Sequence, residues 1–499
     1  MNYFLGLDIG TSGVKAALVD EKGKVKGAAT APHPLLTPRP GWAEQRPEDW
    51  WKSTTQAIAA LLRTTKIKPN RIASVGLSGQ MHSSVFLDGS NRVIRPALLW
   101  CDGRTTEECR AITSRIGEKQ LAEWVCNPAL EGFTLPKVLW LKNHEPEAFA
   151  RLQKVVLAKD YVRYRLTGAL ATEPSDASAT LMYDTARRCW SDRIMRAMDL
   201  DPRLLPDLGA STEVLGTVSR GASKAAGLAE GTPVVGGGAD NACGAVGVGL
   251  VSPGLAVASW GTSGTLLTPT EQPAVDPALR AHTFCHVVPD TWYLMGVMLT
   301  AGGAFAWHVR ELAKELSRRP NVETLLNREA ERIAPGAEGL TFLPYLQGER
   351  TPHRDASARG AFVGLSLAHT RAHMSRAVIE GICFGMRDSL SILRGLSSTI
   401  EQVLVTGGGA KSAFIRKMQA DIYGLPVVRV SPEEGPSYGA ALLAAVGVGA
   451  FANVAAACQN TLTRLDSEPF DPKLHHAYEE PYERFQALYP ALRNFAPPH

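Results

Sequence analysis

Gly10-Thr11-Ser12-Gly13, near the N-terminus, and Gly261-Thr262-Ser263-Gly264, in the second half, are the same tetrapeptide in two places. Each follows a short apolar run, residues 3–9 and 255–260, and further strand-like sequence comes directly after each. A strand, a GTSG turn and a second strand form a hairpin whose tight turn points backbone N–H groups and hydroxyls outward, an arrangement that suits a phosphate. One hairpin in each half therefore predicts two similar domains that hold one nucleotide from opposite sides.

The length and composition are those of a globular protein with more than one core. At 499 residues the chain is too long for a single core, so we expect two large domains, 1–249 and 250–499. Charged residues make up 20% of the chain, and the net charge of +4 is small, with the basic residues scattered. We therefore expect no nucleic-acid partner and no membrane partner. No stretch approaches the ~18 uninterrupted apolar residues of a membrane span.

The cysteines and the N-terminal sequence bear on the compartment. The start, Met1-Asn2-Tyr3-Phe4, has no basic segment and enters a strand at once, which predicts the absence of a secretory signal. Eight cysteines are present, but none forms a C-x-x-C pair and none belongs to a Cys/His cluster with zinc spacing. We therefore expect free thiols and a cytoplasmic location.

Apolar periodicity and turn residues predict alternating strands and helices in both halves, hence an α/β fold with a domain boundary at 249–253. The expected elements are three strands within 1–30, a helix over 47–62, strands over 71–77 and 93–100, mainly helices from 104 to 200, a hairpin around 261, helices over 302–318 and 371–396 with an irregular stretch at 334–362 between them, a strand over 401–406, a helix from 412 and a terminal helix over 474–493.

The first chemical motif is residues 8–15, where a strand that carries Asp8 runs into the first GTSG turn. The glycines permit the tight turn and a close approach of backbone to ligand. Thr11, Ser12 and Lys15 can donate to phosphate oxygens, and Asp8 can hold Mg²⁺ through water. The structural alternative is a plain hairpin in which Asp8 is only a cap.

The second motif, residues 234–247, is a strand that ends in glycines just before a helix that begins next to Asp240. A carboxylate at the mouth of a cleft can accept a proton from a substrate hydroxyl, and N–H groups at the helix start can steady an anion. The alternative role for Asp240 is that of a helix N-cap.

The third motif is the strand at 403–406, which enters Gly407-Gly408-Gly409 before a helix begins at Ser412. A glycine turn of this kind leaves a surface on which a flat base or a ribose lies close to the backbone. Glycine-rich strand–turn–helix units are common, so this motif gains its weight from its place after the other two.

The order of the three motifs resembles that of the actin-like, Hsp70-like and sugar-kinase superfamily, and the finer similarity is to the FGGY carbohydrate kinases. Residues 132–144 resemble the first signature of that family, and residues 360–380 resemble the second. The similarity runs from residue 3 to about 450. It implies two actin-like, ribonuclease-H-like ATPase domains with a cleft between them, a C-terminal helical tail, and transfer of the γ-phosphate of ATP, with Mg²⁺, to a sugar hydroxyl.

Within the family, residues 78–82, 41–45 and 345–353 resemble the branch that phosphorylates D-xylulose to D-xylulose 5-phosphate. Glycerol kinases tend to carry an Arg-Glu pair where this chain has Met81 and His82, which offer an apolar wall and a ring nitrogen to a longer ketose. The resemblance implies that Asp240 is the proton acceptor and that Asp8 is a second catalytic residue, which holds Mg²⁺. The residues implied to contact the sugar are Met81, His82, Asp240, Asn241, Gln45 and Arg104.

The resemblance also implies a set of residues that contact ATP: Thr11, Ser12, Lys15, Thr262, Gly302, Gly408, Gly409 and Ser412. The chain departs from the family pattern at two positions. Ala306 stands where glycerol-kinase-like members can offer a polar side chain near the adenine, and Ser412 replaces an Asn. The adenine contacts are therefore less well defined than the phosphate contacts.

Several of these residues have structural alternatives. His82 has the alternative of a core histidine bonded to backbone, which is the commoner fate of a lone histidine. For Asp102 and Arg104 the alternative role is an internal ion pair, although Arg104 could also reach a hydroxyl of the sugar. Arg350 and His353 lie in a loop whose alternative role is only to lock the two domains together.

Two other functions remain open at this point. One is a different FGGY kinase, acting on ribulose, fuculose, glycerol or gluconate, because no residue fixes the hydroxyl stereochemistry. The other is a non-catalytic, ATP-dependent sensor on the same fold, which would need no carboxylate at the position of attack. Dimers are common in the family, so a homodimer is a further open point.

Overall fold

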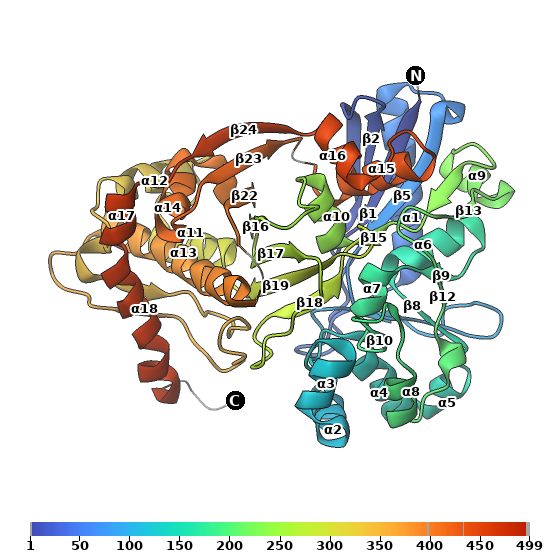
Figure 1. Cartoon of the computed structure of the whole chain (residues 1–499), viewed down its shortest axis with the longest axis horizontal. Coiled ribbons are helices and arrows are strands. Elements are labelled where there is room, and N and C mark those ends of the chain that lie inside the picture. Colours follow the sequence, from blue (N-terminus) through green and yellow to red (C-terminus); the bar gives the residue numbers. More distant parts are fainter. Residues whose placement is uncertain (1, 397–398, 433, 496–499) are drawn as a thin grey trace.

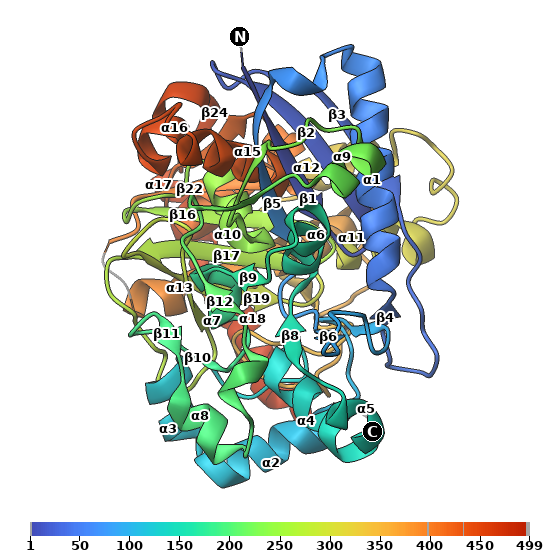
Figure 2. The same ribbon diagram turned by 90° about the vertical axis from the view of Figure 1, so that its right-hand side faces the viewer.

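Two seven-stranded sheets, one in each half of the described chain, organise the molecule (Figure 1). The computed structural model describes residues 2–396, 399–432 and 434–495. The N-terminal half lies on the right of Figure 1 and the C-terminal sheet on the left, and Figure 2 shows the right-hand side face on. Of the helices within the described ranges, none has the length and apolar character that crossing a membrane requires.

The N-terminal sheet is built around β1 (Tyr3–Ile9), which pairs antiparallel with β2 (Gly13–Asp20) and parallel with β5 (Ile72–Gly79). β3 (Val25–Pro32) continues antiparallel beyond β2, and β14 (Pro233–Val235) lies parallel beyond β5. Two short strands complete the sheet, β13 (Val214–Thr217) beside β14 and β15 (Gly238–Ala239) beside the end of β5.

The C-terminal sheet repeats this pattern around β16 (Leu255–Trp260). β17 (Gly264–Thr270) and then β19 (Trp292–Met298) add antiparallel on one side, and β22 (Gln402–Gly407) and β23 (Val427–Ser431) add parallel on the other. The edges are β18 (His282–Cys285) and β24 (Thr463–Glu468). Three antiparallel strands followed by two parallel ones is the ribonuclease-H-like arrangement, so the predicted pair of such domains is confirmed.

Helices and short strands fill the connections between these strands. The helices are α1 (Pro47–Thr65), α2 (Thr106–Ile116), α3 (Glu118–Val125), α4 (Thr134–His144), α5 (Pro146–Ala150), α6 (Ala158–Thr167), α7 (Pro174–Ser178), α8 (Asp192–Ala197), α9 (Arg220–Ala226), α10 (Asp240–Gly247), α11 (Gly302–Leu312), α12 (Val322–Glu331), α13 (Arg371–Leu396), α14 (Ala413–Tyr423), α15 (Pro436–Gly447), α16 (Val454–Thr461), α17 (Pro472–Ala477) and α18 (Glu479–Leu492). The short strands are β4 (Glu44–Gln45), β6 (Val85–Leu87), β7 (Ala97–Leu98), β8 (Lys154–Val156), β9 (Ala171–Thr172), β10 (Tyr183–Asp184), β11 (Cys189–Trp190), β12 (Asp207–Leu208), β20 (Thr341–Leu343) and β21 (Ala361–Val363).

Four predicted elements differ from the structure. The strand expected over 93–100 is interrupted: Val93 forms a single bridge with Leu87, and pairing resumes at β7 after Pro96, which has no N–H to contribute to a ladder. The helix expected over 302–318 ends at Leu312 and gives way to turns. The stretch at 334–362 is not wholly irregular, since it contains the β20–β21 pair. The terminal helix is two helices, α17 and α18, which meet at Tyr478.

The chain returns to the N-terminal sheet after β23, so the sequence boundary at 249–253 does not separate the two bodies cleanly. α15 packs on β1, β2 and β5 and against α10, beside the blue sheet in Figure 1. Glycines make this close packing possible: a Cβ built on Gly6 would lie 1.8 Å from the Ser437 carbonyl oxygen, and one on Gly76 would lie 2.0 Å from that of Ala440. Residues 436–447, assigned to the C-terminal domain from sequence, therefore cover the N-terminal sheet.

This contact predicts the effect of Gly76→Ala. The new methyl group meets backbone rather than a flexible side chain, so the sheet or α15 must move, and we expect a loss of about 3 kcal/mol of unfolding free energy. The matched control is Gly221→Ala in α9, where nothing lies within 4 Å of the new Cβ and stability should be unchanged or rise by up to ~1 kcal/mol. Urea unfolding followed by tryptophan fluorescence measures both. Equal stability of the two variants would contradict the packing.

Candidate active site

Three parallel strand ends form the edge of the N-terminal sheet where Asp8, Gly79 and Asp240 gather. In the register of the sheet, Asp8 of β1 lies beside Ser78 of β5, and Ser78 lies beside Gly238 of β15. Asp240 follows β15 directly and is the first residue of α10. Carboxyl ends of parallel strands are where α/β proteins place ligands. The structure thus brings together the two acidic residues that the sequence singled out.

The two carboxyl groups at this edge hold their protons unusually tightly. Burial, and then the negative charges of Asp8 and Asp176, raise the pKa of Asp240 to about 8. Burial also raises the pKa of Asp8 to about 6, and Asp8 Oδ1 is buried without a hydrogen-bond partner among the described residues. Asp240 is not the N-cap, a place taken by Ala239, although its Oδ1 accepts a hydrogen bond of 2.8 Å from the Asn241 N–H.

His82 lies in a strained turn and presents one ring nitrogen as an acceptor. Its φ of 65° is rare for a non-glycine residue, and its carbonyl oxygen accepts hydrogen bonds from Ser84, Thr134 and Lys137. His82 Nδ1 lies 2.6 Å from the Ala179 carbonyl oxygen, which can only accept, so Nδ1 carries the proton and Nε2 does not. Burial, aided by the charge of Lys137, lowers the pKa of His82 to about 3, so the ring is neutral.

Met81 and Asn241 meet beside this turn. The Asn241 side-chain amide donates to Met81 Sδ over 3.3 Å, so the β5 turn and the start of α10 share one surface. The His82 ring contacts Phe133 at 4.6 Å and Phe284 of β18 at 6.1 Å between centroids. Four of the six residues predicted to contact the sugar, Met81, His82, Asp240 and Asn241, are therefore neighbours, and a strand of the C-terminal sheet borders them.

A buried cluster of charges behind this edge was not predicted from sequence. The Lys159 ammonium forms ion pairs with Asp160 at 2.8 Å and Asp176 at 2.9 Å, and it lies 3.4 Å from Glu173. Burial alone would lower the pKa of Lys159, but these carboxylates raise it. Ser175 donates to Glu173 over 2.7 Å and accepts a 2.9 Å hydrogen bond from the Ala239 N–H, so the cluster fixes the residue just before Asp240. The available signal was Glu173-Pro174, since proline after an acidic residue marks a helix start.

Gln45 and Arg104, two of the residues implied as sugar contacts, make several bonds within the protein. The Gln45 amide is buried; it donates to the Thr11 carbonyl over 2.6 Å and accepts from Trp50 and Gln80. Arg104 has a side chain only 1% exposed and pairs with Asp102 at 2.8 Å and Glu44 at 2.7 Å. Both polar ends of the Gln45 amide have protein partners, whereas Nη1 of Arg104 is buried without one among the described residues, so a sugar contact by either residue stays a prediction. The alternative of an internal Asp102–Arg104 pair is confirmed.

The first GTSG turn is partly occupied by protein groups. The Thr11 hydroxyl accepts from Trp100 Nε1 over 2.9 Å and lies 3.4 Å from Gln80 Oε1. Ser12 is exposed. The Lys15 ammonium forms a partly exposed ion pair of 2.5 Å with Glu434, in the segment before α15, and its phosphate contact stays a prediction.

The second GTSG turn lines an open cavity of about 600 Å³ in the C-terminal domain. Thr262 accepts hydrogen bonds from backbone at the start of α11, and the Gly408 N–H donates to the Trp260 carbonyl over 2.9 Å, which draws three separate segments together. The predicted ATP-contacting residues that line this cavity are Thr262, Gly302, Gly408, Gly409 and Ser412. Ser412 also caps α14 and accepts a hydrogen bond from Asn327, which sequence analysis did not identify.

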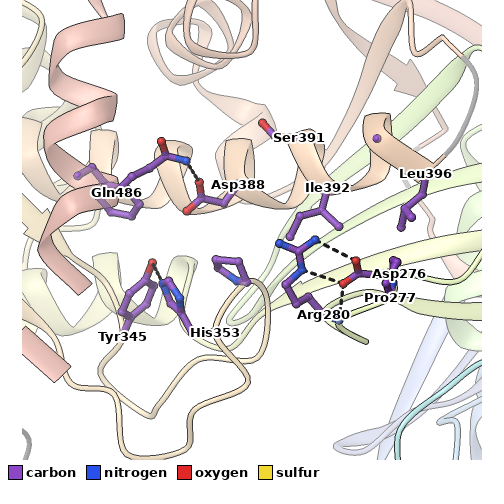
Figure 3. Close-up of a pocket in the computed structure, with 13 residues that line it drawn as sticks. Asp276, Pro277, Arg280, Tyr345, His353, Asp388, Ser391, Ile392, Leu396 and Gln486 are labelled. Carbon is purple, nitrogen blue, oxygen red and sulfur yellow. Dashed lines mark hydrogen bonds and ion pairs between the residues drawn. The ribbon is translucent and has the colours of Figure 1, made fainter. Parts of the chain in front are cut away.

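A second cavity, of about 560 Å³, lies elsewhere in the same domain, between α13, α18 and two loops (Figure 3). Asp388 stands on one side of it, bonded to Gln486, and the Arg280–Asp276 ion pair stands on the other. His353 bonds to the Tyr345 hydroxyl at its lower edge. The described residues that line this cavity include none of the predicted site residues.

Two ribonuclease-H-like domains, one with a glycine-lined cavity and the other with a carboxylate at its strand ends, are the arrangement expected of the actin-like, Hsp70-like and sugar-kinase superfamily. The chain belongs to the FGGY family of carbohydrate kinases, because its N-terminal domain model matches residues 3–247 and its C-terminal domain model matches residues 256–448. It is therefore a sugar kinase that uses ATP as co-substrate.

Individual relatives cover the whole chain. A xylulose kinase of Bacillus subtilis (strain 168) is 40% identical over 504 residues, which is 99% of each chain. The solved structure of a ligand-bound xylulose kinase from Lactobacillus acidophilus has a TM-score of 0.93 at 27% identity, covering 99% of both chains. A gluconate kinase from the same organism has a TM-score of 0.92 at 27% identity, covering 98% of both chains. The fold of this chain is therefore equally similar to that of a xylulose kinase and that of a gluconate kinase, so the fold alone does not identify the sugar.

The environment of Asp240 predicts that Asp240→Asn stabilises the protein. The folded-state pKa of about 8 lies above the ordinary value of 3.8, so stability is greatest at low pH and falls as pH rises from about 4 to about 8. The neutral amide avoids this cost, and we expect a gain of about 1–3 kcal/mol at pH 8 with less pH dependence over that window. Thermal unfolding between pH 5 and 8 measures it. A loss of stability at pH 8 would indicate a structural cap instead.

Proposed function

We propose that the chain is an ATP-dependent kinase that phosphorylates D-xylulose at the 5-hydroxyl. The observation that carries the proposal is the placement of Asp240, a carboxyl group with a raised pKa, beside Asn241 and the Met81–His82 turn. The acceptor is supported by the 40% identity to a full-length xylulose kinase. The turn itself, with an apolar Met81 and an uncharged His82, suits a ketose chain better than a small triol.

In this mechanism Asp240 removes the proton of the sugar hydroxyl as that oxygen attacks the γ-phosphate. Its raised pKa makes it a stronger base than an exposed aspartate, and it acts in the deprotonated form. His82 Nε2 accepts a hydrogen bond from a sugar hydroxyl, and the Asn241 amide lies next to it. ATP lies in the cavity lined by Thr262 and Gly408, so the domains must close to bring donor and acceptor together. Closure also keeps water from the phosphoryl group.

Asp8 fits the role of a Mg²⁺-binding residue. Its Oδ1 is buried without a hydrogen-bond partner among the described residues, and carboxylate oxygen is a ligand that Mg²⁺ prefers. No group of three or more His, Cys, Asp or Glu side chains in the described part of the chain forms a metal site, so the ion would take its other ligands from phosphate and water. When bound, Mg²⁺ offsets the charge of the transferring phosphoryl group.

A cytoplasmic place of action is part of the proposal. All eight cysteines are free, which suits a reducing compartment. A homodimer stays a prediction.

The acceptor is tested by ATP consumption with D-xylulose, D-ribulose, L-ribulose, L-fuculose, glycerol and gluconate, and with a blank that holds no sugar. We expect kcat/KM for D-xylulose to exceed that for every other acceptor at least tenfold, over a slow blank. Faster turnover of gluconate or another polyol would contradict D-xylulose as the acceptor but would leave the kinase activity standing. If none of the sugars changes the rate of ATP turnover, the alternative of an ATP-dependent sensor on the same fold would be favoured.

The base is tested by Asp240→Asn. We expect sugar phosphorylation to fall about 10²–10⁴-fold, because proton removal is lost, while the Kd for ATP stays within twofold. Coupled-enzyme assay and calorimetry measure the two quantities. Transfer at the wild-type rate would show that Asp240 is not the base.

A further inference from the structure

The loop at 349–355 of the C-terminal domain is held rigidly at the border of the sugar-binding side. Thr351 exchanges two hydrogen bonds with Val297 of β19, and Glu349 accepts from the Leu299 N–H over 2.9 Å. Backbone bonds of 2.8 Å in both directions join Glu349 to Asp355 and close the loop. The other side of the loop, at His353, packs at the cavity of Figure 3. The position of Arg350 is therefore set by the sheet.

Arg350 has a guanidinium group without a protein partner. Within the described chain, the hydrogen bonds of Arg350 are made by its backbone, and its guanidinium group, with five N–H donors, forms no hydrogen bond and no ion pair. The residue is half-buried, and burial lowers its pKa. A desolvated cation without a partner is costly, and such a group in a structure needs an explanation.

The surroundings of Arg350 are the residues of the sugar-binding side. Glu349, the residue before it, is bonded to Leu299 just after β19, and β19 pairs with β18, the strand that carries His282. The positive charge of Arg350 contributes to the lowered pKa of His82 and of His282, and the negative charge of Glu131 partly offsets the lowering of the pKa of Arg350. The His282 ring lies 5.8 Å from Phe133, which in turn contacts His82, so these rings form one seam between the halves. The other groups that face His82 are Lys137, through the backbone carbonyl, and the Ala179 carbonyl at Nδ1.

We infer that Arg350 binds the acceptor sugar from the C-terminal domain. Its guanidinium group donates a hydrogen bond to the sugar hydroxyl that donates to His82. A hydroxyl has one proton to donate and lone pairs to accept with. It can therefore donate to the bare Nε2 of His82 and accept from the guanidinium of Arg350 at once. The sugar then bridges a residue of each domain, which couples sugar binding to domain closure. This inference rests on the proposed sugar kinase function.

The competing role for the loop is to lock the domains without touching the sugar. Arg354, four residues on, has that geometry: its guanidinium pairs with Glu118 of α3 at 2.9 Å, with side chains 27% and 55% exposed. Exposed pairs of this kind contribute little. Arg354→Gln is therefore the matched control, since it removes the same charge from the same loop and breaks a direct contact between the halves.

The experiment compares Arg350→Met, Arg350→Lys and Arg354→Gln with the wild type. For Arg350→Met we expect the KM for D-xylulose to rise about 10- to 100-fold, as loss of charge-assisted hydrogen bonds predicts, with the KM for ATP within twofold. Arg350→Lys should recover part of the loss, because a point charge replaces the fork of donors. Arg354→Gln should keep both KM values within twofold. Calorimetric titration of D-xylulose and a thermal scan accompany each variant, and unchanged ATP binding shows that the variant is folded.

The outcomes separate this inference from the proposed function. If the wild type phosphorylates D-xylulose and Arg350→Met keeps its sugar KM, the inference is wrong and the function stands. If Arg350→Met and Arg354→Gln raise the sugar KM equally, or if the ATP KM rises with it, the loop only locks the domains and the inference is again wrong. A wild type that does not use D-xylulose contradicts the proposed function itself.

Discussion

The Lys159 ammonium is buried among three carboxylates, and the edge of the sheet that carries Asp240 rests on this arrangement. Removing one partner of such a cluster would leave an uncompensated buried charge, so the cluster constrains its neighbours strongly. Glu173 transmits that constraint through Ser175 to the Ala239 N–H, one residue from Asp240, the proposed base. The residue before Asp240 is therefore held by a short chain of hydrogen bonds that starts at buried charges.

The same charges also shift the pKa of Asp240, the proposed base. Asp176, a member of the cluster, is one of the negative groups that raise the pKa of Asp240, while Lys159 partly neutralises Asp176 itself. Burying several carboxyl groups at one edge works against folding, because each resists ionisation there. It also moves the base toward the pH at which proton transfer is efficient. Stability and reactivity thus oppose each other at this edge, a usual condition for active sites.

The sequence predicted what depends on local pattern and missed what depends on distant contacts. The two GTSG hairpins and the strand end before Asp240 were predictable because turns and strands leave local signals, and the ordering of motifs predicted the paired domains. The hydrogen bonds from Lys137 to the His82 carbonyl join residues 55 apart in the chain, and α15 returns to β1 across more than 400 residues. Gln45 and Arg104 had the polar chemistry of ligand contacts, but their partners, Thr11, Glu44 and Asp102, are apparent only in the folded chain.

The two GTSG turns have the same sequence but different surroundings. In the first turn, the Thr11 hydroxyl is engaged by Trp100 and Gln80, so a phosphate contact there is expected mainly from exposed Ser12 and the backbone. In the second turn, Thr262 is exposed and lines the cavity with Gly302 and Gly408. An open, glycine-lined surface can receive a nucleotide before the domains close, whereas the first turn lies on the sheet that carries the sugar residues. The two turns share a sequence, but the side chains packed around each one leave only the second lining an open cavity, so in the proposed mechanism the nucleotide enters there and meets the first turn on closure.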